Sequence, residues 1–526
     1  MNAKASSARI AGVILITFAA LIAAERLWAY DKPIEKDVSI YAVLGHELLA
    51  GRALYSDLLE LRPPAVMVTY AAAEAVVGYG RRTIFLLYVV TTIITLLGIY
   101  YAASATGGSL TAGLWAAAFW AVLSGSYGLE AGEPNTEIFM NACLTWAFGL
   151  WVRCGEASSR VRRALIIGAL FAFASLYKHV VVVCPALLGI IHVAFPPPGD
   201  GGRRRAALDV VTIAAVGVGV WALVSGYFAA TGRFEIFREM MTGASLDYAA
   251  ARNASFAVER TSMTGVILRN IFAPLRREAE FVLDMLTPLA VLTGLGVAVG
   301  IFRNRRRWAL LTAFAVATWI EIALPGQFFI HYYQLWLPPL AVGAGWAVGG
   351  VEVALIGRKL NWFPHLAGAV TLSLLIASQI PFYRMNAAGD WSAIESREGM
   401  AAEPLAREIN SLLAPDETFY EWGSNPSLYF HAKRRAPSGV LMVWWFLDGR
   451  LADQLSKRVI ADLERAQPKL LVVTKEAWPE NPVEHPVSKW LFERYRPLPG
   501  NDGRGPFALY VRRDGALATP LPPSRT

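Results

Sequence analysis

Long apolar runs separated by short polar turns dominate the first 384 residues. A helix needs about 20 apolar residues to cross the hydrocarbon core of a bilayer. The apolar stretch 65–79 is short and carries Glu74, so we expect it to lie along the membrane interface. The remaining runs predict about eleven spanning helices, near residues 10–30, 83–102, 110–124, 136–152, 164–178, 180–196, 209–231, 283–302, 308–324, 327–349 and 364–384.

Clusters of arginine and lysine separate several of these segments, as at 160–163, 203–205 and 303–307. Basic residues resist transfer across a membrane, so these turns are expected to be cytoplasmic. The N-terminus is then on the cytoplasmic side of the membrane. The segments expected on the outer side are 31–64, 125–135, 232–280, 325–327 and everything after Tyr383.

Composition supports a membrane protein, with 55% hydrophobic and only 17% charged residues. Soluble domains carry about 25% charged residues. The net charge of +8 comes largely from the basic turns, so we expect no nucleic-acid partner. The chain has three cysteines without a metal-like pairing, and it shows no phosphate-cradling glycine loop, zinc spacing or nucleophile elbow.

The tail from 385 to 526 is charged and lacks a spanning segment. Amphipathic helices at 401–414 and 456–467 alternate with apolar strands at 418–422, 469–475 and 506–513, which predicts a small extracytoplasmic α/β domain. The last dozen residues are rich in proline and small side chains, and we expect them to be disordered. The predicted architecture is a polytopic α-helical domain, 1–384, followed by this domain, 385–526.

The first outer loop, 31–64, carries the leading candidate for chemistry. Asp37 is predicted to open a short amphipathic helix near the lipid–water boundary, where it could act on a polar substrate whose lipid tail stays in the bilayer. Aspartate is also a favoured helix N-cap, so capping and general-base chemistry both fit. Tyr55 and Asp57 could bind sugar hydroxyls or pin the loop, and Arg62 is a further candidate ligand.

The second outer loop brings three carboxylates to the same predicted side, Glu130, Glu133 and Glu137. They could hold a base, orient an acceptor or bind a divalent cation. Glu137 opens a helix, where an acid meets the positive end of the helix dipole. Glu133 has no comparable structural role that would explain an acid at its position, so we favour it as a second catalytic acid.

Other polar residues interrupt apolar helices at the expected outer face. Lys178 and His179 form one such pair, which could meet a phosphate or snorkel to water. Gln327, His331 and Tyr332 form a second group, suited to a phosphate or a sugar. The segment 232–280 adds arginines whose planar fork suits phosphate, at positions Arg233, Arg238, Arg252, Arg260, Arg269, Arg276 and Arg277.

Asp37 with Tyr41, Ala42, Gly45, Gly51, Tyr55, Asp57, Pro63 and Pro64 resembles the first outer loop of the GT-C glycosyltransferases. The bacterial protein mannosyltransferase and aminoarabinose-transferase branch is the most similar. The resemblance implies a polyprenyl-phosphate sugar donor, extracytoplasmic transfer and Asp37 as general base. Members often carry Asp-Glu here, whereas this chain has Asp37 followed by Val38.

The sequence therefore predicts a membrane glycosyltransferase with a lipid, glycan or protein acceptor. Lys178, His331 or an arginine of 232–280 would stabilise the departing lipid phosphate. The alternative is a transporter or flippase of a lipid-linked or small polar solute. Transporters place polar groups near the bilayer midplane and carry internal repeats, whereas here the polar groups gather at one face and no repeat is seen.

Overall fold

The computed structural model describes residues 2–104, 110–154, 159–198, 201–245, 268, 270–271, 279–357, 359–360, 362–392, 395–447, 451–475, 485–498, 505–515 and 517. The chain divides into two compact units. The helical unit comprises 1–30, 85–231 and 248–387, and the mixed unit comprises 31–84, 232–247 and 388–526. Residues 518–526 of the tail that we expected to be disordered lie outside the described residues.

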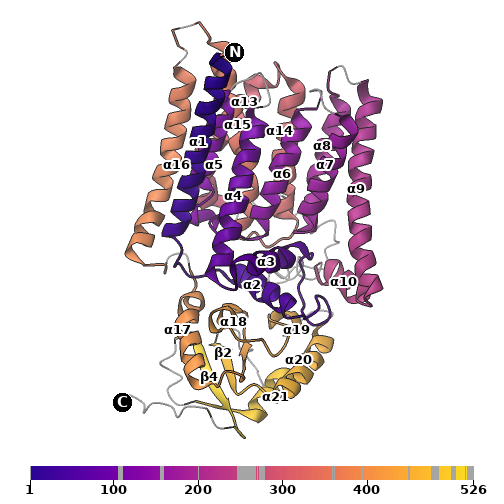
Figure 1. Cartoon of the computed structure of the whole chain (residues 1–526), viewed down its shortest axis with the longest axis vertical. Helices are drawn as coiled ribbons and strands as arrows, with labels where there is room; N and C mark the ends of the chain where they lie inside the picture. Colours follow the sequence, from indigo (N-terminus) through magenta and orange to yellow (C-terminus); the bar gives the residue numbers. More distant parts are fainter. Residues whose placement is uncertain are drawn as a thin grey trace. The chain divides into compact units, whose positions relative to one another are not determined.

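Long apolar helices run side by side in the helical unit (Figure 1). They are α1 (Asn2–Trp28), α4 (Arg81–Ser104), α5 (Leu110–Leu123), α6 (Thr136–Val152), α7 (Arg160–Ser175), α8 (Val183–Ala194), α9 (Gly202–Ala230), α13 (Ala279–Gly300), α14 (Arg305–Ala323), α15 (Leu337–Ala354) and α16 (Phe363–Ala388). Short 3₁₀ turns interrupt them at η1 (Tyr127–Leu129), η2 (His179–Val182) and η3 (Ile330–Trp336). Each predicted apolar segment coincides with one of these helices.

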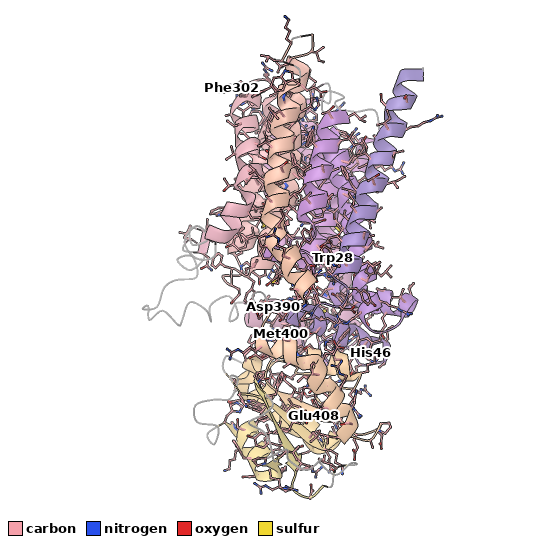
Figure 2. The ribbon with its side chains drawn as sticks, turned by 90° about the vertical axis from the view of Figure 1, so that its left-hand side faces the viewer. Trp28, His46, Phe302, Asp390, Met400 and Glu408 are labelled. Carbon is pink, nitrogen blue, oxygen red and sulfur yellow. The ribbon has the colours of Figure 1, made fainter. Side chains whose placement is uncertain are left out.

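Five helices of the described chain are both long and apolar enough to cross a membrane: Ser6–Trp28, Arg81–Ser104, Gly202–Ala230, Ile330–Ala354 and Phe363–Ala388. The other apolar helices are shorter or less hydropathic, so the number of eleven spans stays a prediction. Large apolar side chains point outward from the bundle, such as Leu223 on α9 and Phe302 after α13, the latter labelled in Figure 2. Such a surface is stable only against lipid or another apolar partner.

The helical unit is held together by close helix packing, with α15 lying against both α5 and α13, and α7 against α9. Small residues permit this approach. A side chain at Gly345 of α15 would collide with the backbone of α5 at Ala112. Small residues at helix crossings are the usual means of tight packing in membranes, because lipid supplies no hydrophobic drive for association.

The mixed unit contains a four-stranded sheet in the order β1-β2-β4-β3. The strands are β1 (Phe419–Trp422), β2 (Leu470–Thr474), β3 (Tyr495–Pro497) and β4 (Phe507–Arg512). β1 and β2 are parallel, with Phe419 opposite Leu470, whereas β4 runs antiparallel to both β2 and β3. Every residue of β1 and β2 is buried, as the apolar strand pattern predicts. The short strand β3 was not predicted.

Helices α17 (Arg397–Leu412), α18 (Ser427–Ala432), α19 (Trp444–Leu447), α20 (Ala452–Ala466) and α21 (Pro486–Arg494) accompany this sheet. Met400 and Glu408 mark the course of α17 in Figure 2. The helix begins four residues before the predicted segment, because the Ser396 hydroxyl accepts the Gly399 amide and caps it.

One acid of the sheet, Glu421 on β1, is fully buried. Its carboxylate accepts hydrogen bonds from the Thr474 hydroxyl at 2.8 Å and from the Asn425 amide at 3.3 Å. Burial raises the pKa of Glu421 to about 7, although these two hydrogen bonds oppose the rise.

The first outer loop belongs to the mixed unit together with the tail. It contains α2 (Lys36–Leu49), which packs against α3 (Ala65–Val77) of the stretch 65–79, and α18 packs on α2. The Leu59 amide donates to the Gly439 carbonyl at 3.1 Å. Any side chain at Gly439 would overlap the Asp57 carbonyl, so the loop and the tail approach backbone to backbone here.

Candidate functional site

Helix α2 presents Asp37 in its first turn. The helix is capped by Glu35, whose carboxylate accepts the Val38 amide at 3.2 Å. The prediction of Asp37 as the N-cap is therefore wrong, because the helix starts two residues earlier than predicted and Glu35 occupies the cap position. The Asp37 carboxylate is consequently available to side chains rather than engaged by the helix backbone. Gly51 ends the turn after α2 with a left-handed φ of +87°.

Arg62 joins two carboxylates of the first outer loop. Its Nη2 donates to Asp37 Oδ2 and its Nη1 to Glu60 Oε1, the latter at 3.0 Å. The guanidinium also lies 5.3 Å from the centre of the Tyr41 ring. Asp37 and Arg62 side chains are 15% and 17% exposed, whereas that of Glu60 is fully buried. The pair is thus screened from bulk water but reachable at one edge.

Glu60 is a component that the sequence reasoning missed. Its Oε1 also accepts the backbone amides of Leu61 and Arg62, whereas its Oε2 is buried with no hydrogen bond inside the described structure. Burial raises the pKa of Glu60, and the nearby charge of Arg62 opposes this rise. The available signal was an acid two residues before Arg62 and three residues before the Pro63-Pro64 pair.

Tyr55 and Asp57 fix the shape of the loop that carries Arg62. The Tyr55 hydroxyl donates to the Arg62 carbonyl at 2.6 Å, and the buried ring meets Phe237 of α10 (Phe234–Met241) edge-on. Asp57 Oδ2 accepts the Ala53 amide at 2.8 Å. These contacts favour the pinning role of both residues over sugar binding, which stays a prediction.

In the helical unit, the second outer loop brings Glu130 to His331. Glu130 has a left-handed φ of +50° directly after η1, and its Oε2 lies 3.0 Å from His331 Nδ1. Gln334 of η3 donates to the Glu130 carbonyl at 3.0 Å. The structure therefore joins two candidates that are 201 residues apart in the chain.

An ion pair of the helical unit joins Lys178 to Glu137. Lys178 Nζ lies 2.8 Å from Glu137 Oε1 and 3.4 Å from the centre of the Tyr332 ring. The Thr136 hydroxyl donates to the other oxygen of Glu137 at 2.9 Å. The Lys178 charge is thus already balanced by a buried carboxylate, which weakens the case for Lys178 alone as a phosphate ligand.

The remaining candidates differ in exposure. Glu133 and Gln327 are buried, whereas His179 is exposed at the start of η2. The roles assigned to them stay predictions, as does the meeting of Glu133 with Asp37 in one pocket. Among the residues that the structure covers, no three His, Cys, Asp or Glu side chains group as metal ligands.

Of the arginines of 232–280, Arg233 donates to the Leu54 carbonyl at 2.9 Å and Arg238 pairs with Glu235 on α10 at 2.7 Å. Both bonds suit a structural role. The others lie outside the described residues, namely Arg252, Arg260, Arg269, Arg276 and Arg277.

No protein-family model and no curated protein sequence matches this chain. Solved structures do match it. ArnT from Cupriavidus metallidurans bound to undecaprenyl phosphate has a TM-score of 0.63 at 15% identity, with 94% of this chain and 97% of ArnT covered. AglB, an oligosaccharyltransferase from Archaeoglobus fulgidus in complex with an inhibitory peptide and a dolichol-phosphate, has a TM-score of 0.50 at 13% identity, with 97% of this chain and 75% of AglB covered.

The mycobacterial arabinofuranosyltransferase AftD also matches, with a TM-score of 0.50 at 13% identity over 95% of this chain and 40% of AftD. All three are GT-C glycosyltransferases. The chain therefore has the GT-C fold, which confirms the predicted resemblance at the level of the fold. Together with its apolar helices, this fold identifies a multi-pass membrane protein.

Proposed function

We propose that this chain is an integral-membrane glycosyltransferase that moves a hexosyl or pentosyl group from a polyprenyl-phosphate donor to an envelope acceptor. The observation that supports this most is a partly exposed carboxylate, Asp37, held by Arg62 beside a second acid, in a chain with the GT-C fold. The acceptor is a lipid, a glycan or a protein. Transfer takes place on the extracytoplasmic face of a bacterial inner membrane, an orientation that follows from the basic cytoplasmic turns.

Asp37 acts as the general base in this proposal. It takes the proton from an acceptor hydroxyl or amine while that oxygen or nitrogen bonds to the anomeric carbon of the sugar. The bond between the anomeric carbon and the phosphate oxygen breaks, and its electron pair leaves with the polyprenyl phosphate. A positioned base contributes about 10²–10⁴-fold to such a step.

Cationic side chains stabilise the departing phosphate. Arg62 is the first candidate, because its guanidinium forms charge-assisted bonds with carboxylates in a geometry that also suits phosphate oxygens. His331 is a second candidate, with Glu130 setting the orientation of its ring through Nδ1. Lys178 is a third candidate and, like Arg62, is already paired with a carboxylate, that of Glu137.

The acids of the second outer loop have a supporting role in the proposal. Glu133, as the second acid, orients the acceptor. A divalent cation at Glu130, Glu133 or Glu137 would supply positive charge to the leaving phosphate. Growth of the producing strain in chelator-treated medium, followed by metal-addition assays on purified protein, tests that requirement.

Mass spectrometry of envelope glycolipids and glycans tests the proposed reaction. A deletion strain should lack one glycosylated product, wild-type protein should restore it, and Asp37→Asn should not. Purified protein in proteoliposomes should release polyprenyl phosphate from the accumulated donor. A deletion strain with unchanged glycans contradicts the proposal, and transbilayer movement of the donor without release of phosphate supports the flippase alternative instead.

A further inference from the structure

A polar cavity of about 390 Å³ lies within the mixed unit, with walls that include none of Asp37, Glu60 or Arg62. Asp31 and Arg81 line it from the segment before α2 and from the start of α4. Trp391, Met400, Glu403, Arg407 and His431 line it from the tail. Met400 is labelled on α17 in Figure 2. The volume falls in the range of about 300–1,000 Å³ that is typical of small-ligand pockets.

The walls of this cavity are joined by a shared carboxylate. Glu403 accepts Arg81 Nη2 at 2.9 Å and Arg407 Nη1 at 3.2 Å. Arg81 Nη1 also donates to the Lys32 carbonyl at 2.6 Å. Because Arg81 and Glu403 are 322 residues apart, these bonds fix two distant segments around one space. Such a prearranged cavity loses little conformational entropy when a ligand binds.

The formal charges of the cavity cancel. Arg81 and Arg407 are balanced by Glu403 and Asp31. Burial lowers the pKa of His431 to about 4, so its imidazole is neutral near pH 7. A cavity with no excess of positive charge has no electrostatic preference for a phosphate or another anion.

The chemistry of the lining matches an uncharged polyol. Sugar hydroxyls both donate and accept hydrogen bonds, and the cavity offers guanidinium donors beside carboxylate and imidazole acceptors. Arg407 is 70% exposed, which leaves N–H groups within reach of a ligand. Trp391 and Met400 provide the apolar surface that the C–H face of a pyranose requires.

We propose that this cavity binds an uncharged sugar residue of the acceptor, an assignment that rests on the glycosyltransferase function proposed above. It gives the enzyme an acceptor subsite separate from the donor phosphate. The acceptor is then a glycan or a glycosylated lipid, since a peptide would have no sugar to place there.

Saturation-transfer NMR on the full-length protein in lipid nanodiscs tests the subsite. The probes are the methyl glycosides of mannose, glucose, galactose and N-acetylglucosamine. At least one should receive saturation from the wild-type protein, and Trp391→Ala and Arg407→Ala should each weaken its binding at least fivefold. The matched control is Arg465→Ala, because Arg465 is equally exposed and pairs with Asp462 on α20 at 3.4 Å. It should leave binding unchanged.

Several results would overturn the subsite. They are the absence of binding by every probe, binding that both cavity variants retain, and displacement of the sugar by inorganic phosphate. Displacement by a short-chain polyprenyl-phosphate sugar would assign the cavity to the donor and refute the acceptor role. Thermal unfolding of each variant verifies its fold, and Arg407→Ala on the exposed face carries the test if Trp391→Ala fails to fold.

The binding measurement needs no transfer, so it separates the two proposals. Glycoside binding should persist in the Asp37→Asn protein, which retains the cavity. If the cavity variants lose glycoside binding but still form the envelope product, only the subsite is refuted. Unchanged envelope glycans in the deletion strain refute the transferase function, whether or not the methyl glycosides bind.

Discussion

Replacing Asp37 by asparagine removes one negative charge and leaves the shape of the side chain almost unchanged. Arg62 keeps its second partner, because Glu60 Oε1 stays within 3.0 Å of Nη1. One charge-assisted hydrogen bond at a partly exposed site contributes about 1 kcal/mol. The variant should therefore fold and insert into the membrane, with a small loss of thermal stability. Its transfer rate should fall by about 10²–10⁴-fold, because an amide accepts no proton.

The assay is the formation of the envelope product in a complemented deletion strain, followed by phosphate release from the donor by purified protein. The matched control is Glu47→Gln on the same helix. Glu47 is buried and, like Asp37, is paired with arginine, at 3.1 Å from Arg435 and 3.4 Å from Arg52. Its replacement should lower stability without abolishing transfer, because it breaks an ion pair of α2 remote from the proposed chemistry.

Wild-type transfer by purified Asp37→Asn would refute the base assignment. Equal losses of transfer in Asp37→Asn and Glu47→Gln would also refute it, because the effect would then follow from damage to α2. A lowered rate that rises with pH in Asp37→Asn would agree with the assignment, since hydroxide then replaces the missing base.

Three further changes test interactions inside each of the two units. Lys178→Ala should lower the free energy of unfolding by about 3–5 kcal/mol, because it leaves the Glu137 charge buried and unbalanced; thermal unfolding in detergent measures the loss. Tyr55→Phe should cost about 1–1.5 kcal/mol, because it removes the buried hydrogen bond to the Arg62 carbonyl, and limited proteolysis should then cut the first outer loop sooner. Glu421→Gln should remove about 3 kcal/mol of pH dependence between about pH 4.5 and 7, as measured by unfolding across that range.

Each of these changes has a defined control. The double variant Lys178→Ala with Glu137→Gln should be less destabilised than Lys178→Ala, and additive losses would contradict the ion pair. Unchanged proteolysis in Tyr55→Phe would contradict the pinning role.

For Glu421, the pKa of about 7 in the folded state lies above the value in the unfolded state, so the folded state binds more protons at pH values between these two pKa values. Its contribution is therefore complete below about pH 4.5 and is lost as the pH rises through 7. Parallel curves for wild type and Glu421→Gln would refute this.

Local sequence was enough to locate the helices, because their formation depends on apolar composition and on the breaks between runs. The strands at 418–422, 469–475 and 506–513 could be predicted for a similar reason, since short apolar runs between turns favour buried strands. The short β3 could not, because Tyr495–Pro497 has no apolar pattern of its own and pairs only with β4. The predicted N-cap of α2, Asp37, was two residues too late, because the side chain of Glu35 caps the helix.

The candidate site was only partly predictable. Sequence alone drew attention to Asp37 and to the acids of the second outer loop, because charged residues beside apolar helices are costly and therefore conspicuous. It did not identify the partners. Glu60 is a fully buried partner of Arg62, and no local sequence pattern reveals this burial.

By itself, the order of apolar and polar residues determined that this chain is a polytopic helical protein with acidic loops and a strand-containing tail. Only the tertiary structure decided that Arg62 pairs with Asp37, that Lys178 pairs with Glu137, and that Arg81 meets Glu403 around a cavity. The physical reason is distance along the chain. Apolar patterning acts over a few residues, whereas an ion pair between residues 25, 41 or 322 positions apart exists only after the backbone has folded.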